Sequence, residues 1–280
     1  YCRKIIGKED KTRFVEKIFS YSFFFERDKN KKLIWFHAAS IGEAKSIFSL
    51  VKKLKEENSE LVFLITTVTL SSGNLVRKKF EVYKNIHHRY LPVDVNFLVK
   101  KFLNIWKPDL IIFVDSEIWP NLIFEINKRK IPSAIINGRI TEKSFKKWMK
   151  VPSFAKQIFG TFNLSLASSK KSKEYLEKLG AKNLKYIGNL KFSEILDENE
   201  IINDNKQILK DNNFWVAAST HEGEEDLCLK THITLKKEFQ NLKTIIIPRH
   251  INRSNKIKLL CDNLNLSSQI LNENEKIINY

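Results

Sequence analysis

Polar turns that directly follow apolar runs hold the side chains that could perform chemistry in this chain. One is His37-Ala-Ala-Ser40-Ile-Gly42-Glu43, which follows the run Leu33–Phe36. Another is Asp115-Ser-Glu117, which follows Leu110–Val114. A carboxylate held at such a turn can take a proton from a reacting hydroxyl as a general base. Because carboxylates next to a buried strand end are costly without a partner, we interpret both turns as candidate sites.

A further pair of turns, in the last third of the chain, combines acidic and basic side chains. It consists of Ala218–Glu225 and of Pro248-Arg249-His250, which follows Ile245–Ile247. A strand therefore delivers the Arg249 guanidinium to a sheet edge, where its fork of N–H donors suits a phosphate. The alternative that the sequence leaves open is an ion pair between Arg249 and Glu222, Glu224 or Glu225.

The turn that contains Glu43 also has a purely structural interpretation. Ser40-Ile-Gly42-Glu43 is an S-x-x-E capping box, in which serine and glutamate satisfy free N–H groups at a helix start. Asp115 and Glu117 could likewise complement a helix dipole. We expect Glu43 to point into a cleft between domains, kept ionised by the helix N-terminus, while Ser40 caps the helix without its help.

Around these turns, apolar runs alternate with helical spacing, as in a parallel sheet that is covered on both faces. Ligands bind such open sheets at the carboxyl ends of the strands. The predicted strands are Leu33–Ala38, Leu61–Thr66, Leu110–Val114, Ser133–Asn137 and Phe162–Ala167. The predicted helices lie near Ala44–Glu56, Gly73–Phe80, Val95–Ile105, Trp119–Lys130 and Lys170–Leu179.

A second, shorter α/β block follows a polar stretch. Its predicted strands are Trp215–Ala218, Thr244–Ile247 and one near Ser268–Leu271, with helices over Glu224–Lys237 and after Asn252. We therefore divide the chain into a basic aromatic segment 1–30, a Rossmann-like domain 31–192, a linker 193–213 and a partial Rossmann-like domain 214–280. So small a second sheet would leave an uncovered edge, and we expect the chain to be a fragment.

The composition narrows the choice of partners. Lys+Arg 49 against Asp+Glu 32 gives a net charge of +17, which favours nucleic acid, phospholipid or a phosphorylated substrate. Because the basic residues are dispersed, solvated lysines are an equal alternative. Residues 1–30 interleave aromatic and basic side chains, so this segment could lie on an anionic membrane surface or pack on the domain as a helix. No apolar run approaches the ~20 residues of a membrane span.

The sequence argues against several classes of site. With 8 glycines in the chain, neither GxGxxG nor GxxxxGK[ST] occurs, which disfavours dinucleotide and P-loop phosphate binding. Asp115-Ser-Glu117 has the spacing of a metal-binding DxD pair but lacks its second aspartate. The cysteines Cys2, Cys228 and Cys261 show no ligand spacing, which disfavours structural zinc and fits a reducing compartment.

Taken together, the motifs resemble those of the 3-deoxy-D-manno-octulosonic acid (Kdo) transferases, which add Kdo to the lipid A precursor of lipopolysaccharide. They stand in family order: His37-Ala-Ala-Ser-Ile-Gly-Glu43, Tyr90-Leu-Pro-Val-Asp94, Ser116-Glu-Ile-Trp-Pro-Asn121, Asn137-Gly-Arg-Ile140, Gly188-Asn-Leu-Lys-Phe192, Ala218-Ser-Thr-His-Glu-Gly-Glu-Glu225 and Pro248-Arg-His250. The resemblance extends from Lys8-Glu9-Asp10 almost to the end of the chain.

The resemblance implies an α/β, GT-B-type fold of two Rossmann-like domains that face a cleft, the C-terminal one incomplete here. It implies inverting transfer from CMP-Kdo, with no metal and no other cofactor, to a lipid A precursor at the cytoplasmic face of the bacterial inner membrane. It makes Glu43 the general base and gives Asp115 and Lys191 the role of stabilising the transition state. With the turns described above, it assigns substrate binding to Ser40, Gly42, Glu117, His221, Glu222, Pro248, Arg249 and His250.

The chain departs from the family pattern in places. Asp115 stands where Glu is usual, and Ser193 replaces the Asp that commonly follows the Lys-Phe pair. The family's hydrophobic anchor and Gly-rich donor loop are not in the sequence, so we expect reduced or no activity from this chain alone. The rival hypotheses are a GT-B enzyme that uses a UDP-sugar and a basic nucleic-acid-binding protein. The motifs disfavour both, and we expect no nucleic-acid partner.

Overall fold

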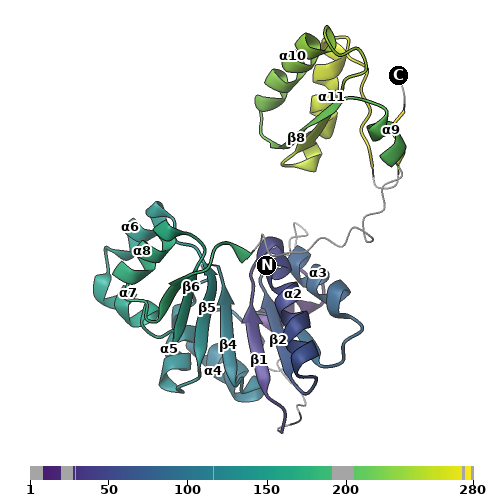
Figure 1. Ribbon diagram of the computed structural model, residues 1–280. Coiled ribbons are helices and arrows are strands. Elements are labelled where there is room, and N and C mark those ends of the chain that lie inside the picture. Colours follow the sequence, from purple (N-terminus) through teal and green to yellow (C-terminus); the bar gives the residue numbers. More distant parts are fainter. Residues whose placement is uncertain are drawn as a thin grey trace. The chain divides into compact units, whose positions relative to one another are not determined.

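The computed structural model describes residues 9–19, 28, 30–115, 117–190, 205–272 and 275–278. The chain divides into two compact units, Tyr1–Ile195 and Leu196–Tyr280, which are described separately below (Figure 1). Among the described residues, no helix combines the length and the apolar character needed to cross a bilayer.

The first unit contains a seven-stranded sheet in which all neighbouring strands are parallel, in the order β3-β2-β1-β4-β5-β6-β7. The strands are β1 (Leu33–His37), β2 (Val62–Thr67), β3 (Ile86–Tyr90), β4 (Leu110–Val114), β5 (Ser133–Gly138), β6 (Leu164–Ala167) and β7 (Leu184–Tyr186). The direction of the strand order reverses between β1 and β4. This doubly wound arrangement is the Rossmann-like domain that the sequence predicts.

Helices cover both faces of this sheet (Figure 1). They are η1 (Arg13–Lys17), α2 (Ile41–Glu57), α3 (Leu70–Phe80), α4 (Asn96–Trp106), α5 (Pro120–Lys128), α6 (Glu142–Trp148), α7 (Pro152–Phe159) and α8 (Lys170–Lys178). Phe36 and Phe63 pack on one face with apolar residues of α2 and α3. Trp35 and Leu64 pack on the other face with α4, α5 and α7, and the Trp35 ring centroid lies 5.1 Å from that of Phe102.

The strands and helices predicted for the first block are confirmed, with shifts of a few residues at their ends. The sequence prediction missed β3, β7, α6 and α7. β3 reads Ile-His-His-Arg-Tyr and alternates buried with half-buried residues, because it lies at the edge of the sheet rather than inside it. β7 is Leu-Lys-Tyr, which is too short to give a pattern.

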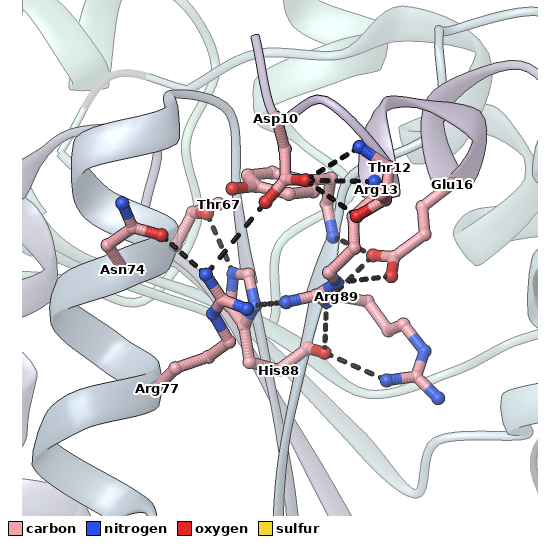
Figure 2. Close-up of polar contacts among 10 residues, drawn as sticks. Asp10, Thr12, Arg13, Glu16, Thr67, Asn74, Arg77, His88 and Arg89 are labelled. Atoms are coloured by element: carbon pink, nitrogen blue, oxygen red, sulfur yellow. Dashed lines mark hydrogen bonds and ion pairs between the residues drawn. The ribbon is translucent and has the colours of Figure 1, made fainter.

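A polar cluster fastens η1 to the edge strand β3 (Figure 2). Arg13 binds Glu16 through two hydrogen bonds of 2.6 and 2.9 Å, and its Nη1 lies 3.1 Å from His88 Nδ1. Glu16 also accepts a 2.9 Å hydrogen bond from the Tyr90 N–H. The described part of segment 1–30 therefore packs on the domain, as one alternative foresaw. A membrane contact of this segment stays a prediction.

The second unit contains a parallel pair of strands, β8 (Phe214–Thr220) and β9 (Lys243–Pro248). Its helices are α9 (Lys206–Lys210), α10 (Glu224–Lys236), η5 (Ile251–Arg253) and α11 (Ser254–Asn263). These elements confirm the predicted second α/β block. The strand predicted near Ser268–Leu271 is wrong, because these residues have no regular structure. They pair with neither β8 nor β9, and an isolated strand cannot satisfy its backbone groups.

Candidate active site

The first two candidate turns meet at the point where the strand order reverses. β1 and β4 are parallel neighbours, with His37 opposite Phe113. Glu43 lies in the first turn of α2, after β1, and Asp115 directly follows β4 with a left-handed φ of 63°. The negative charge of Asp115 acts on Glu43 across this edge. The turns thus form one carboxylate-rich site at the topological switch point, where open α/β sheets bind ligands.

The Glu43 carboxylate is buried and is held by the loop that precedes its helix. Its Oε2 accepts a 2.8 Å hydrogen bond from the Ala39 N–H, and its Oε1 accepts a 2.7 Å bond from the Ser40 hydroxyl. Ser40 Oγ in turn accepts from the Glu43 N–H at 3.4 Å. The expectation that Ser40 caps the helix without the help of Glu43 is therefore wrong, and the capping-box interpretation is confirmed. The capping interaction closes because a buried carboxylate needs hydrogen-bond donors.

Burial is the largest influence on the pKa of Glu43, and it raises that pKa. Hydrogen bonds from Ser40 and Ala39 lower the pKa, the charges of Glu117 and Asp115 raise it again, and the net shift is upward. The helix N-terminus therefore does not dominate, contrary to expectation. A raised pKa makes Glu43 a stronger base than an ordinary glutamate. A carboxylate offers about four acceptor positions, so two hydrogen bonds leave room for a substrate hydroxyl.

Glu117 belongs to a partly buried polar network at the same strand ends. The Trp119 Nε1–H lies between two acceptors, Glu117 Oε2 and His37 Nε2, at 3.1 Å from each. His37 is fully buried, and its Nδ1 lies 2.9 Å from Thr66 Oγ1. Glu117 is thereby oriented by Trp119 beside His37. The sequence analysis treated His37 and Trp119 only as parts of motifs, because their role depends on contacts between distant segments.

Asp94 joins two of the sequence motifs. Its carboxylate accepts 2.9 Å hydrogen bonds from the N–H groups of Asn121 and Leu122, which open helix α5. The Asn121 side chain returns a 2.7 Å hydrogen bond to the Asp94 carbonyl. Asp94 therefore caps α5 from another segment and fixes the turn that carries Glu117. The sequence offered Asp94 only as part of a family motif, and the structure gives it a supporting role.

Ser40 and Gly42 lie at the start of α2, where Ser40 is the N-cap and Gly42 precedes Glu43. Lys191 and Ser193 lie outside the described residues. The segment before Lys191 is anchored to the site, because the Leu190 N–H donates a 3.1 Å hydrogen bond to Asn137 Oδ1 at the end of β5. The contribution of Lys191 to the transition state stays a prediction.

In the second unit, the predicted turns share one edge because β8 and β9 are parallel. His221 and Glu222 follow β8, and Arg249 and His250 follow β9; all four are exposed. Pro248 ends β9 itself. The Arg249 N–H donates a 3.0 Å hydrogen bond to the Thr220 carbonyl, which ties the two turns together. The structure thus brings these candidate residues to one surface.

The residue that organises this surface is Arg253, which the sequence analysis missed. Its guanidinium binds the buried Glu225 carboxylate through two hydrogen bonds of 2.8 Å, and Thr220 Oγ1 donates a further 2.8 Å bond to Glu225. Burial opposes ionisation of Glu225, but the hydrogen bonds from Arg253 and Thr220 outweigh it and lower its pKa. Among the described residues, Glu222 pairs with Lys256, and Arg249 takes part in none of the ion pairs. The ion-pair alternative for Arg249 is therefore wrong.

The fold and the switch-point site define the class as GT-B, shared by glycosyltransferases and sugar-nucleotide epimerases. UDP-GlcNAc 2-epimerase from Neisseria meningitidis aligns with a TM-score of 0.57 at 14% identity, covering 82% of this chain and 69% of the epimerase. The HepE protein of Anabaena, solved with UDP and glucose, aligns with a TM-score of 0.51 at 13% identity, covering 88% and 68%. At such identities the likeness establishes the fold alone.

Sequence comparison identifies the family. The family described as 3-deoxy-D-manno-octulosonic-acid transferase (kdotransferase) matches residues 12–194. The Kdo transferase of Rickettsia bellii is 34% identical over 278 residues, covering 98% of this chain and 65% of that protein. The Haemophilus influenzae enzyme is 31% identical over 235 residues, covering 79% and 53%. This chain therefore belongs to the Kdo transferase family, and it spans about half to two-thirds of the length of these relatives.

Proposed function

We propose that the protein transfers Kdo from CMP-Kdo to a lipid A precursor, with inversion and without a metal, as a step of lipopolysaccharide biosynthesis. The observation that carries the proposal is the position of Glu43 beside Asp115 at the switch point of a Kdo transferase-family domain. A metal-independent inverting transfer needs one general base on the face of the sugar opposite the leaving group.

Glu43 is the base in this mechanism. Its carboxylate takes the proton of the acceptor hydroxyl, the hydroxyl oxygen bonds to the anomeric carbon of Kdo, and the bond from that carbon to the CMP phosphate oxygen breaks. The raised pKa of Glu43 favours proton uptake, and the hydrogen bonds from Ala39 and Ser40 hold the carboxylate in place. General bases contribute roughly 10²–10⁴-fold to rates, so positioning of both substrates supplies the rest.

Departure of CMP develops negative charge on phosphate, which a cation can stabilise in place of a metal. Arg249 supports this role because it is exposed at the carboxyl end of β9, joins no described ion pair and has its backbone fixed to Thr220. Pro248, His250, His221 and Glu222 lie on the same edge and complete the proposed nucleotide contacts. Lys191, which lies outside the described residues, stays the second cation that the family resemblance assigns to the transition state.

The acceptor side of the proposal includes the membrane. A net charge of +17 suits an anionic lipid surface and the phosphates of the acceptor, since each Lys or Arg near such a surface contributes ~1 kcal/mol. We place the enzyme at the cytoplasmic face of the bacterial inner membrane, bound to its surface, where lipid IVA would be the acceptor.

A transfer assay with the full-length protein tests this function. The protein is incubated with lipid IVA and either CMP-Kdo or UDP-GlcNAc, and the products are resolved by mass spectrometry. We expect a mass increase of one or more Kdo units with CMP-Kdo and no product with UDP-GlcNAc. Transfer or epimerisation of the UDP-sugar, with no reaction of CMP-Kdo, would show that the protein is a different GT-B enzyme.

A further inference from the structure

A pocket of about 350 Å³ opens beside the carboxylate site, at the carboxyl ends of β5 and β6. Its lining includes Asp115, Asn137, Arg139, Ser168, Lys171 and Tyr175. The volume lies at the lower end of the roughly 300–1,000 Å³ that small-molecule sites occupy. Asp115 belongs both to this pocket and to the site that contains Glu43. None of the candidate residues found in the sequence, apart from Asp115, lies in it.

The walls of the pocket are fixed by internal hydrogen bonds. Ser172 Oγ accepts a 3.2 Å bond from the Ile140 N–H, and Ser168 Oγ donates a 3.1 Å bond to the Gly138 carbonyl. The Tyr175 ring stacks on Phe145 with centroids 4.4 Å apart and an angle of 11° between the planes. These contacts hold the Ser168, Ser172 and Tyr175 side chains of the pocket lining in place, and small-molecule sites combine aromatic walls with a few placed polar groups in this way.

One end of the pocket is electropositive. Arg139 and Lys171 line it, and helix α8 begins there with Ser169 as its N-cap and no acidic residue in its first turn. Glu142 also lines this end, but it pairs more closely with Lys146, at 2.8 Å, than with Lys171, at 3.7 Å. The basic side chains and the positive helix end favour an anionic group here. Asp115 follows β4 and α8 follows β6, so they enter the pocket from the two sides of β5.

We propose that this pocket binds a sugar ring that carries an anionic group, with the anion against Arg139, Lys171 and the start of α8. The proposal rests on the proposed function and deepens it. The charge polarity of the pocket would orient the ring, because Asp115 and the neighbouring carboxylates repel an anion and Arg139 attracts it. The anion is either the carboxylate of the transferred sugar acid or a phosphate on the acceptor, since each can accept two N–H hydrogen bonds from one guanidinium.

Kinetics of the full-length enzyme test the proposal. Arg139→Gln and Lys171→Gln remove the two cations, and Lys173→Gln removes an exposed lysine of the same helix that does not line the pocket. We expect both pocket variants to raise the KM of one substrate roughly 10- to 100-fold, the loss expected for one hydrogen bond to a charged group. Because binding rather than proton transfer is affected, kcat should stay within about threefold, and Lys173→Gln should match wild type.

The substrate whose KM rises identifies the anion. A rise for CMP-Kdo assigns the pocket to the sugar carboxylate, and a rise for the lipid acceptor that disappears with a dephosphorylated acceptor assigns it to a phosphate. Unchanged KM values, or equal changes in Lys173→Gln, overturn the proposal. Calorimetric titration with free Kdo and with inorganic phosphate tests anion binding by the pocket independently of the proposed function. If wild type catalyses no transfer, binding of either probe that is lost in Arg139→Gln still supports the pocket, and no binding overturns it.

Discussion

Glu43 Oε1 accepts a 2.7 Å hydrogen bond from the hydroxyl of Ser40, the residue that caps the same helix. The proposed base is therefore also part of a helix cap. Ser40 stabilises the negative form of Glu43 and so holds down a pKa that burial raises. Catalysis and capping are compatible because the carboxylate keeps free acceptor positions.

Ser40→Ala is expected to shift the acid limb of the rate profile to higher pH. The substitution removes a hydrogen bond that lowers the pKa of Glu43, so more of the carboxylate stays protonated at a given pH. It also removes the N-cap of α2, at a cost of about 1 kcal/mol. Thr69→Ala is the matched control, because Thr69 caps α3 through the Ser72 N–H and does not bind Glu43. An unshifted acid limb in Ser40→Ala would show that the hydroxyl does not tune the base.

His88 is expected to make the first unit sensitive to acid. Burial, reinforced by the charge of Arg13, lowers the pKa of His88 from 6.5 to about 2. Below pH 6.5 His88 binds a proton in the unfolded chain, whereas in the folded chain it stays neutral. The stabilising contribution is therefore complete above 6.5 and is lost as the pH falls towards 2, by at most ~1.4 kcal/mol per pH unit.

Urea unfolding followed by tryptophan fluorescence at a series of pH values measures this effect. His88→Asn should lose stability less steeply than wild type between pH 6.5 and 3. His87→Asn is the comparison, because burial lowers the pKa of His87 only to about 4, so its influence should end near that pH. Parallel stability curves for wild type and His88→Asn would contradict the prediction.

Asp94→Ala is expected to destabilise the first unit by about 1–2 kcal/mol, since α5 loses the cap of two N–H groups. Asp94→Asn should lose less, because one amide oxygen can still accept. Glu60→Ala breaks an exposed pair with Lys31 and should change stability little. Denaturant unfolding of the three variants measures the order. Equal stability of Asp94→Ala and wild type would show that Asp94 does not stabilise α5 as a cap.

Arg253→Lys is expected to weaken nucleotide binding although Arg253 is not assigned a substrate contact. Lysine keeps the charge but cannot make both hydrogen bonds to Glu225, so the turns that carry His221 and Arg249 should loosen. Titration of the full-length protein with CMP should show a higher Kd, with kcat less affected. Lys230→Ala, which breaks an exposed pair on α10, is the control. Wild-type CMP affinity in Arg253→Lys would contradict a positioning role.

The sequence predicted the parts of the fold that depend on local patterns. β1, β2 and β4 are buried on both sides and appear as continuous apolar runs. The edge strand β3 escaped prediction because its buried His88 is paired with Arg13 of η1, which lies 75 residues away in the chain. A contact with so distant a segment cannot be recognised from the residues that surround β3 in the sequence.

The candidate site was likewise predictable only where it depends on local sequence patterns. Motif order identified the turns that contain Glu43, Asp115 and Arg249, and the structure brings these turns to strand ends. The S-x-x-E pattern predicted the contact between Ser40 and Glu43, but the hydrogen bond from the Ala39 N–H was not predictable from it. Arg253 was overlooked because it acts through Glu225, which only the fold brings close, and Arg139 was seen as part of a motif but given no role. The sequence held one indication of a residue such as Arg253. Glu225 lies at a helix start, and a carboxylate that becomes buried there needs a cationic partner.

The central claim is that Glu43 accepts the proton of the acceptor hydroxyl. Its most direct test is single-turnover transfer from CMP-Kdo to lipid IVA by full-length Glu43→Gln, with the CMP dissociation constant measured on the same preparation. Glutamine keeps the shape, and its one oxygen can still accept from the Ala39 N–H while its amide donates to the Ser40 hydroxyl, but it cannot take a proton. We predict a loss of roughly 10²–10⁴-fold in the transfer rate with CMP affinity within about twofold of wild type. Transfer at the wild-type rate would contradict the account.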